Sequence, residues 1–208
     1  MNLAPEFIAD IEKRIKLRFI DNGTGNLTAT FGPEDVFNYI YAVFHSPTYR
    51  ERYAQFLKID FPRVPLTSNV ECFVRLCSLG SELAALHLLE SPTLDRPMTN
   101  FPIRDANRVD KGYPRYSPPG EHAPGSDTPI DCGRVHINAE QYFNNVPPEV
   151  WQFHVGGYQV CDKWLKDRRE RNLSYDEVCV YMRIVKALAE TIRLMREIDG
   201  AITEWPIT

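Results

Sequence analysis

The sequence has few of the features that identify membrane, secreted or disulfide-stabilised proteins. No apolar run reaches the ~18 residues that a membrane-spanning helix needs. The amino-terminal residues mix acidic and basic side chains, which is not the pattern of a signal peptide. The five cysteines are odd in number and form no Cys-x-x-Cys pair, so free thiols are the simplest interpretation. We therefore expect a cytoplasmic protein without a membrane partner.

Motifs for catalysis are also missing. The glycines of Asp21-Asn-Gly-Thr-Gly-Asn26 are not followed by the Gly-Lys-Ser/Thr of a phosphate-binding loop. No acidic residue is followed two positions later by lysine, as the metal site of a restriction nuclease would require. Asn145-Val-Pro-Pro148 approaches the Asn-Pro-Pro-Tyr loop of amino-methyltransferases, but Val146 interrupts it and a plain turn is the better interpretation. The five histidines show no zinc spacing. We expect no enzymatic activity, cofactor or metal in this chain.

Excess positive charge is absent as well. The chain of 208 residues carries 24 Lys and Arg against 28 Asp and Glu, a net charge of −4. No global attraction to nucleic acid follows from this balance, so DNA binding would have to rest on a local basic surface. The hydrophobic fraction of 43% is ordinary for a globular protein and sufficient for a core.

Helical patterns occupy the first 90 residues. Helices are predicted from Ala4 to Arg18 and from Pro33 to about His45. A capping box, Ser68-Asn-Val-Glu71, opens a long helix that ends before Pro92. The second helix has an apolar stripe, which we expect to be buried and which comprises Phe37, Ile40, Tyr41 and Phe44.

The composition changes at Ser91. Eight prolines between there and Asp131 exclude one long helix, so this segment is a functional loop or is built on short strands. Its middle is basic and aromatic, with Tyr113 and Tyr116 among Arg104, Arg108, Lys111 and Arg115.

The stretch from Trp151 to Ser174 organises the second half. Alternation over Trp151–Val155 predicts a strand, Gly156-Gly157 a turn, and Tyr158–Lys166 a short helix with Trp164 as a core anchor. A basic tail follows, and Ser174 and Glu177 form a capping box for a last helix that runs from Tyr175 to about Asp199. The cations of the tail are Lys163, Lys166, Arg168, Arg169 and Arg171.

These patterns predict an α+β fold with a helical amino-terminal half, a small and mostly antiparallel sheet in the middle, and a long carboxy-terminal helix. The predicted parts are a helical subdomain, 1–90, and a loop-rich sheet with closing helices, 91–208, which together form one compact unit. Because the chain opens directly on a helix pattern, we expect it to be a piece of a larger polypeptide.

Several motifs, in this order, support a more specific interpretation. They are Tyr39-Ile-Tyr-Ala-Val-Phe-His-Ser-Pro47 with Tyr49-Arg50, Phe56-Leu-Lys-Ile-Asp-Phe-Pro-Arg-Val-Pro65, Leu86-His-Leu-Leu-Glu90, Gly133-Arg-Val-His-Ile-Asn138, Gln141-Tyr-Phe143, Gly156-Gly-Tyr-Gln-Val160 and Lys163-Trp-Leu-Lys-Asp-Arg168. Together they resemble the carboxy-terminal target-recognition segment of Type ISP restriction–modification enzymes. Those enzymes are single chains that join nuclease, ATP-driven motor, methyltransferase and recognition domains. Residues 1–30 and the segment from Ser91 to Cys132 do not match the pattern.

The resemblance implies a non-catalytic domain that binds duplex DNA at a short asymmetric site and presents the target adenine to a separate methyltransferase domain. S-adenosylmethionine, ATP and Mg would belong to the parent enzyme, whose methyltransferase and motor domains would be the partners. Family members recognise different sites, so base contacts are expected in the unmatched segment, at Arg104, Arg108, Lys111 and Arg115. Phosphate contacts are expected at Lys163, Lys166, Arg168, Arg169 and Arg171.

Two alternatives remain open. The chain could be a helical interaction module that couples methyltransferase and motor domains without base readout, or a small enzyme whose site has no recognisable motif. A continuous basic surface would favour DNA, a large apolar patch would favour docking, and a deep charged pocket would favour an enzyme.

Overall fold

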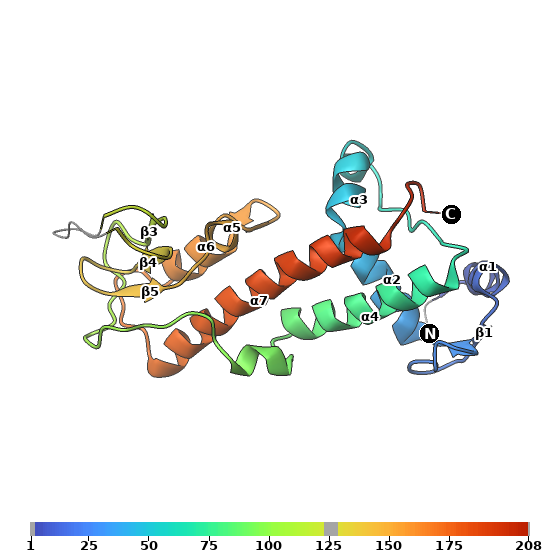
Figure 1. Cartoon of the computed structure of the whole chain (residues 1–208), viewed down its shortest axis with the longest axis horizontal. Coiled ribbons are helices and arrows are strands. Elements are labelled where there is room, and N and C mark those ends of the chain that lie inside the picture. The colour runs from blue at the N-terminus through green and yellow to red at the C-terminus, as the bar shows by residue number, and fades with distance from the viewer. Residues whose placement is uncertain (1–2, 123–128, 208) are drawn as a thin grey trace. The chain divides into compact units, whose positions relative to one another are not determined.

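A computed structural model of the chain describes residues 3–122 and 129–207 (Figure 1). It has the predicted mixed α+β composition, with a three-stranded antiparallel sheet and a long carboxy-terminal helix. The chain forms two compact units, one made of residues 1–88 and 193–208, the other of residues 89–192. Each unit is described separately below.

The helical unit is built from four helices and the end of a fifth. Its long elements are α1 (Pro5–Ile15), α2 (Pro33–His45), α4 (Val70–His87) and the last residues of α7 (Tyr175–Ala201). The shorter ones are α3 (Pro47–Arg52), the 3-10 turn η1 (Phe56–Lys58) and a parallel pair of two-residue strands, β1 (Arg18–Phe19) and β2 (Thr30–Phe31). The helices predicted from sequence are therefore present, with α2 at its predicted bounds.

Close packing of α2 against α4 decides which face of α2 is buried. A Cβ atom on Gly80 of α4 would lie 1.9 Å from the backbone oxygen of Asn38 in α2, so only glycine permits this approach. The buried residues of α2 are accordingly Val36, Tyr39, Ala42 and Val43, together with Asp35. The predicted face was wrong: Phe37 is 55% exposed and stacks on Tyr41. The most apolar side of α2 is therefore not its buried side, because α4 approaches closely enough to pack against the smaller Val and Ala side chains.

The start of α4 also differs from the prediction by one residue. Asn69, not Ser68, is the capping residue, and its side-chain oxygen accepts from the backbone N–H groups of Glu71 and Cys72 at 2.9 and 3.1 Å. Asn and Ser are equally good caps, so sequence alone could not choose between neighbouring candidates.

The second unit packs a small sheet and short helices against the first half of α7. The sheet has the order β3 (Arg115–Ser117), β4 (Arg134–His136), β5 (Tyr142–Asn144), antiparallel throughout. The other elements are the 3-10 turn η2 (Pro92–Asp95), α5 (Pro148–Trp151) and α6 (Val160–Lys166). Val135, Phe143, Leu165 and Tyr181 are fully buried in the shared core, which joins sheet, α6 and α7.

The predicted strand from Trp151 to Val155 was wrong. Pro148 begins the short helix α5, which is favoured because proline is preorganised for the first helical position. Only His154–Val155 (β6) is extended, and it pairs with Tyr158–Gln159 (β7) across Gly156-Gly157. The alternation of apolar residues therefore marked a helix turn followed by an exposed hairpin. The helix after it, α6, buries Cys161 and Leu165, with Trp164 partly buried against the same core.

Candidate nucleic-acid interface

The basic loop and the basic tail, which the sequence placed on two separate surfaces, lie side by side. Residues 107–109 run along residues 170–173 and exchange backbone hydrogen bonds with them. Val109 N–H donates to the Arg171 carbonyl at 3.1 Å, and Glu170 N–H donates to the Val109 carbonyl at 2.7 Å. Leu173 N–H donates to the Asn107 carbonyl at 2.9 Å. The segments that carry Arg108 and Arg171, a predicted base contact and a predicted phosphate contact, are therefore adjacent in the second unit.

Three cations gather around the turn at Gly112 and Tyr113. Arg169 Nε donates to the backbone carbonyl of Tyr113 at 2.5 Å. Arg115 Nε donates to the Gly112 carbonyl at 3.2 Å, and its guanidinium lies 5.0 Å from the centroid of the Tyr113 ring. Lys111 is exposed in the same turn. We call Lys111, Arg115 and Arg169 the basic turn.

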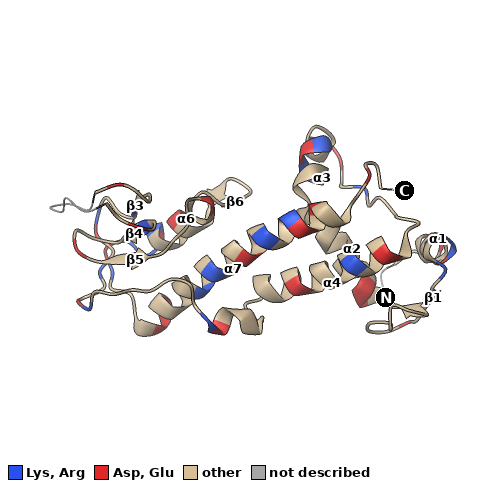
Figure 2. Ribbon diagram, in the orientation of Figure 1, with Lys and Arg blue, Asp and Glu red and all other residues tan. Residues whose placement is uncertain are grey.

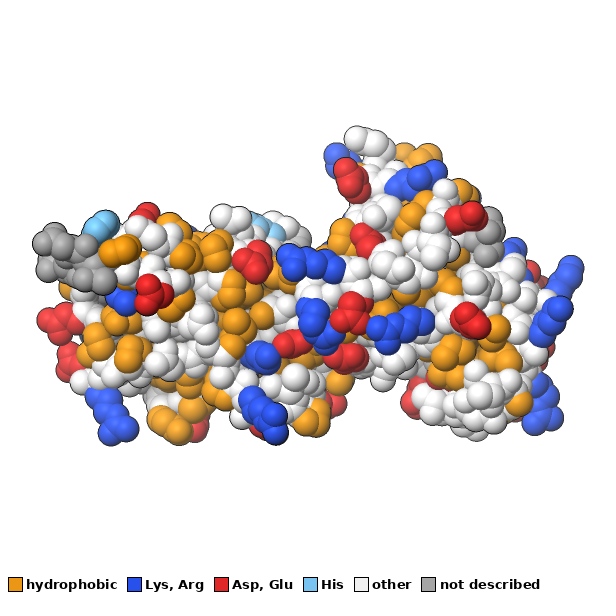
Figure 3. Space-filling view, in the orientation of Figure 1, with side chains coloured by type: hydrophobic (Ala, Val, Ile, Leu, Met, Phe, Trp, Pro, Cys, Tyr) orange, Lys and Arg blue, Asp and Glu red, His pale blue; other side chains and the backbone are white. Residues whose placement is uncertain are grey.

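Five of the nine candidate cations are paired with four acidic neighbours, because Arg168 and Arg171 share Glu177. The ion pairs are Arg108–Asp110 (3.5 Å), Lys163–Asp167, Lys166–Asp162 (2.6 Å), Arg168–Glu177 (3.1 Å) and Arg171–Glu177 (2.6 Å). The other four, Arg104, Lys111, Arg115 and Arg169, form no ion pair within the described part of the chain. In Figure 2 α6 shows this mixture of charges, and in Figure 3 basic and acidic side chains are interspersed on the face shown. The positive charge available to a ligand is therefore concentrated at the basic turn and Arg104.

Arg168 is held by the fold on three sides. Its guanidinium lies 3.6 Å from the centroid of the Trp164 ring, its Nη1 donates to the Trp164 carbonyl at 3.0 Å, and its Nε donates to Glu177 at 3.1 Å. Glu177 also completes the predicted capping box with Ser174: each backbone N–H donates to the other residue's side chain, at 3.0 and 3.2 Å. The Ser174 N–H and then Arg171 hold the pKa of Glu177 below its ordinary value. Arg168 and Glu177 thus fasten α6 to the start of α7.

A buried glutamine positions the loop that carries Arg104. Gln141 is completely buried, and its Nε2 donates to the Ile103 carbonyl and to Asn107 Oδ1, both at 2.9 Å. Its Oε1 accepts from the Asn107 N–H at 2.9 Å and from Asn138 Nδ2 at 3.1 Å. The loop is therefore fixed at both ends, at Ile103 and Asn107, by a residue that comes from one of the recognised motifs. The sequence analysis missed this role. The signal for it was a glutamine placed between the turn after β4 and the start of β5.

Tyr116, by contrast with Tyr113, is part of the fold. Its hydroxyl donates to the Val146 carbonyl at 2.9 Å and its ring stacks on Trp151 with 5.3 Å between centroids. Burial raises the pKa of Tyr116 to about 12. A Cβ on Gly133 would lie 2.1 Å from this hydroxyl, which explains glycine at the start of that motif.

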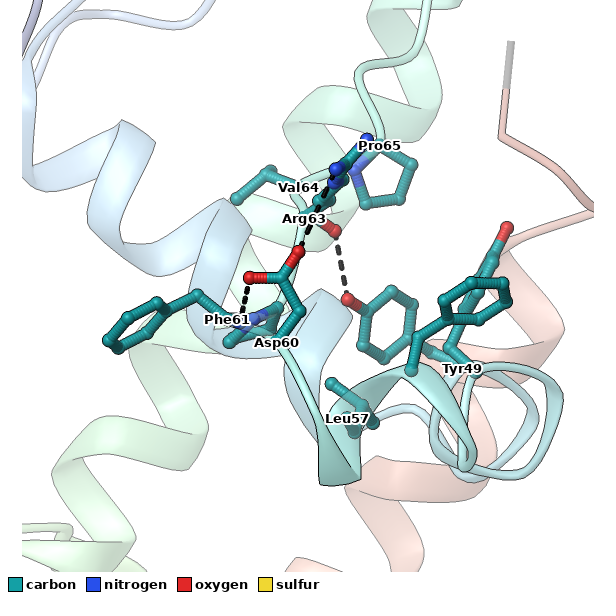
Figure 4. A pocket seen from close by; sticks show the side chains of 10 residues that line it. Tyr49, Leu57, Asp60, Phe61, Arg63, Val64 and Pro65 are labelled. Atoms are coloured by element: carbon teal, nitrogen blue, oxygen red, sulfur yellow. Dashed lines mark hydrogen bonds and ion pairs between the residues drawn. The ribbon is translucent and has the colours of Figure 1, made fainter.

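The helical unit has an apolar cavity of about 390 Å³, shown in Figure 4. Tyr49, Leu57 and Val64 line it, the Tyr49 hydroxyl donates to the Arg63 carbonyl at 2.8 Å, and Asp60 pairs with Arg63 at 3.7 Å. Phe61 is among the lining residues, but it is 89% exposed and its ring points away from Tyr49. The lining is mostly apolar, with Asp60 and Arg63 as its charged members.

Two other sequence expectations concern metals and membranes. Within residues 3–122 and 129–207, no group of three or more His, Cys, Asp or Glu side chains could hold a metal ion. In the same residues no helix has the length and apolarity needed to cross a membrane.

Comparison with known families is decisive for identity. Residues 1–197 match the Type ISP C-terminal specificity domain. The chain belongs to this family. The resemblance inferred from the sequence motifs is thereby confirmed. No curated protein matches the chain.

Solved structures with the same fold support the assignment. The Type ISP restriction–modification enzyme LlaGI, as a nuclease-deletion mutant in complex with a DNA substrate mimic, matches with a TM-score of 0.55, 22% identity and 82% of this chain. The DrdV–DNA complex matches with a TM-score of 0.55, 24% identity and 79% coverage. The ATP-dependent Type ISP enzyme LlaBIII bound to DNA matches with a TM-score of 0.54, 19% identity and 84% coverage. This chain spans only 14%, 18% and 11% of those chains.

Proposed function

We propose that this specificity domain binds duplex DNA at a short asymmetric site and positions the target adenine for a separate methyltransferase domain. The observation that carries the proposal is the basic turn, where Lys111, Arg115 and Arg169 lie together without ion pairs among the described residues. Family membership and the DNA-bound state of the three similar enzymes support it.

The proposed contribution of each cation to DNA binding depends on the interactions that the cation already makes within the protein. Lys111, Arg115 and Arg169 are proposed to take backbone phosphates, since none of them is paired with an acidic side chain among the described residues and each keeps N–H donors for a phosphate. Lys163, Lys166, Arg108 and Arg171 would have to exchange an acidic partner for phosphate, so they contribute less. Arg168 is proposed to affect DNA binding only indirectly, by holding α6 against the start of α7.

No chemistry is proposed for this chain itself. The methyl donor S-adenosylmethionine, ATP and Mg would be bound by other domains of the parent enzyme. The five cysteines are all free thiols, which supports a reducing cytoplasmic location.

A comparison of duplex and single-stranded DNA of one sequence tests this function. Fluorescence anisotropy of the intact protein with labelled DNA should show tighter binding to the duplex, because only the duplex presents paired base edges in a groove. Equal affinity for both forms would contradict duplex recognition.

A second candidate function is docking, and exposed apolar side chains in the helical unit favour it. Phe56 and Phe61, which line the apolar cavity, are 65% and 89% exposed, and Ile59 between them in the sequence is 83% exposed. Large apolar residues grouped on a surface mark interaction sites. We propose that this face contacts another domain of the parent enzyme. If so, Ile59→Asp with Phe61→Asp should weaken domain association in the intact protein, measured by limited proteolysis, without altering DNA affinity.

A further inference from the structure

A hollow of about 680 Å³ lies between the loop that carries Arg104 and the first turn of α7. Its wall includes Asn100, Arg104 and Asp105 from the loop and Tyr175 from the helix. Tyr175 is 79% exposed, so its ring is accessible from solvent. The capping box accounts for Ser174 and Glu177 but gives Tyr175 no role.

Three polar side chains of this hollow are unused by the fold. Asn100, Arg104 and Asp105 are exposed, and their side chains make no hydrogen bond or ion pair with any other described residue. Arg, Asn and Asp are the side chains that match guanine, adenine and cytosine edges, respectively. A solvated loop often has such residues, but here the backbone beneath them is fixed.

The fixation is specific. Asn100 exchanges backbone hydrogen bonds with Asn144 of β5, at 3.4 and 2.8 Å. Gln141 holds the Ile103 carbonyl before Arg104 and the Asn107 N–H after Asp105. Because the backbone is already held, only the side chains have to be ordered when a ligand binds, which lowers the entropic cost of binding.

Arg104 and Tyr175 are electrostatic neighbours. Cys179, one turn along the helix, raises the pKa of Tyr175, and the guanidinium of Arg104 acts in the opposite direction. Both side chains line the hollow, the cation suited to a guanine edge or phosphate and the phenol to packing on a sugar or base.

From this geometry we infer that the hollow is the base-reading subsite of the domain, with Arg104, Asn100 and Asp105 reading base edges of duplex DNA and Tyr175 packing against the nucleotide beside them. This inference rests on the proposed function and deepens it. It separates the tasks of neighbouring cations: Arg104 reads bases, whereas the basic turn binds phosphate. Of the four residues expected to contact bases, it retains Arg104 alone.

Selection from a duplex library with a randomised segment tests the inference in the intact protein. The wild type and the variants Arg104→Ala, Asn100→Ala, Asp105→Asn, Tyr175→Ala and Tyr175→Phe are compared with Arg52→Ala, a matched control. Arg52 is exposed in the helical unit and forms no ion pair with the described residues there.

Arg104→Ala should relax preference at one base position by about 5- to 150-fold, the value of a bidentate contact. Asn100→Ala and Asp105→Asn should change preference at other positions. Tyr175→Phe should bind as the wild type does, since the ring and not the hydroxyl makes the contact.

Three outcomes are distinguishable. Unchanged base preference in all hollow variants, with the wild type selective, overturns the subsite and leaves DNA recognition standing. A uniform loss of affinity over all sequences assigns the hollow to phosphate binding and also overturns the inference. A wild type that selects no sequence overturns both the subsite and the proposed function. Equal melting temperatures of the variants ensure that the comparison reports on binding.

Discussion

Arg169 Nε donates to the backbone carbonyl of Tyr113 at 2.5 Å, although 56 residues separate them in the chain. This bond fixes the basic tail against the proline-rich loop, so that cations from both lie around one turn. The sequence motifs had divided these cations into a phosphate surface and a base surface. We propose a different division, between the basic turn as the phosphate surface and the hollow at Arg104 and Tyr175 as the base-reading surface.

Two helical glycines give a matched test of the packing. Gly80→Ala should destabilise the protein by about 1–3 kcal/mol, because the new Cβ would collide with the Asn38 carbonyl. Gly200→Ala meets no atom within 4 Å and should stabilise α7 by about 0.5–1 kcal/mol. Urea unfolding measures both values. Equal effects of the two substitutions would contradict the close approach of α2 and α4.

The anchoring role of Gln141 predicts a loss of both stability and selectivity. Gln141→Leu keeps the volume but leaves the Asn107 N–H and the Ile103 carbonyl without their partner, at a cost of about 3 kcal/mol. Base preference should relax as well, because the loop around Arg104 is no longer held. Gln55→Leu, at an exposed position, should change stability by about 0.5 kcal/mol or less. Thermal unfolding and library selection are the readouts, and full selectivity of Gln141→Leu would show that the loop needs no anchor.

Trp164 and Arg168 should behave as a unit. Trp164→Ala should cost about 3 kcal/mol, since the ring packs 5.3 Å from the buried ring of Tyr181 and carries the Arg168 guanidinium. Arg168→Ala should cost less, about 1 kcal/mol. A double-mutant cycle by urea unfolding should give a coupling energy that differs from zero. Additive effects would mean that the cation and the ring act independently.

His45 should make stability depend on pH. Burial, with smaller contributions from Arg50 and His87, lowers the pKa of His45 to about 4, while Nδ1 donates to the Tyr41 carbonyl at 2.7 Å. The unfolded chain binds the proton near pH 6.5 and the folded chain only near pH 4, so stability is full above pH 6.5 and falls as the pH drops towards 4.

The loss from His45 should be about 1–2 kcal/mol, less than the whole shift implies because the ring is partly solvated. His45→Gln should remove that part of the pH dependence between pH 7 and 5. An unchanged profile would exclude His45 as its source. His87, whose pKa is also lowered by burial, accounts for a remaining slope.

The success of each sequence prediction depended on whether the interactions involved join neighbours in the chain or residues far apart in it. Two local signals were confirmed: Pro33 began α2 and the Ser174–Glu177 box began α7. Predictions of which residues are buried were not reliable, because burial depends on which element packs against each helix or strand. The exposed Phe37 and the hairpin at Val155 looked like core residues because apolarity does not reveal which neighbour fits.

The site shows the same limit. Basic residues could be picked from composition, but their ion pairs with Asp162, Asp167 and Glu177 could be known only from the fold. The capping box explained Ser174 and Glu177, and no pattern in the sequence indicated a role for Tyr175 between them. The buried position of Gln141 depends on a loop more than 30 residues earlier in the chain.

The most direct test of the central claim is the salt dependence of duplex binding. The triple variant Lys111→Ala, Arg115→Ala, Arg169→Ala should bind all sequences more weakly and lower the slope of log K against log salt by about 3, one for each lost phosphate contact. A control triple variant, Arg18→Ala, Arg52→Ala, Lys58→Ala, removes the same charge from the helical unit and should leave the slope within about 0.5 of the wild type. Equal slopes for the basic-turn variant and the wild type, measured in the intact protein, would contradict the account.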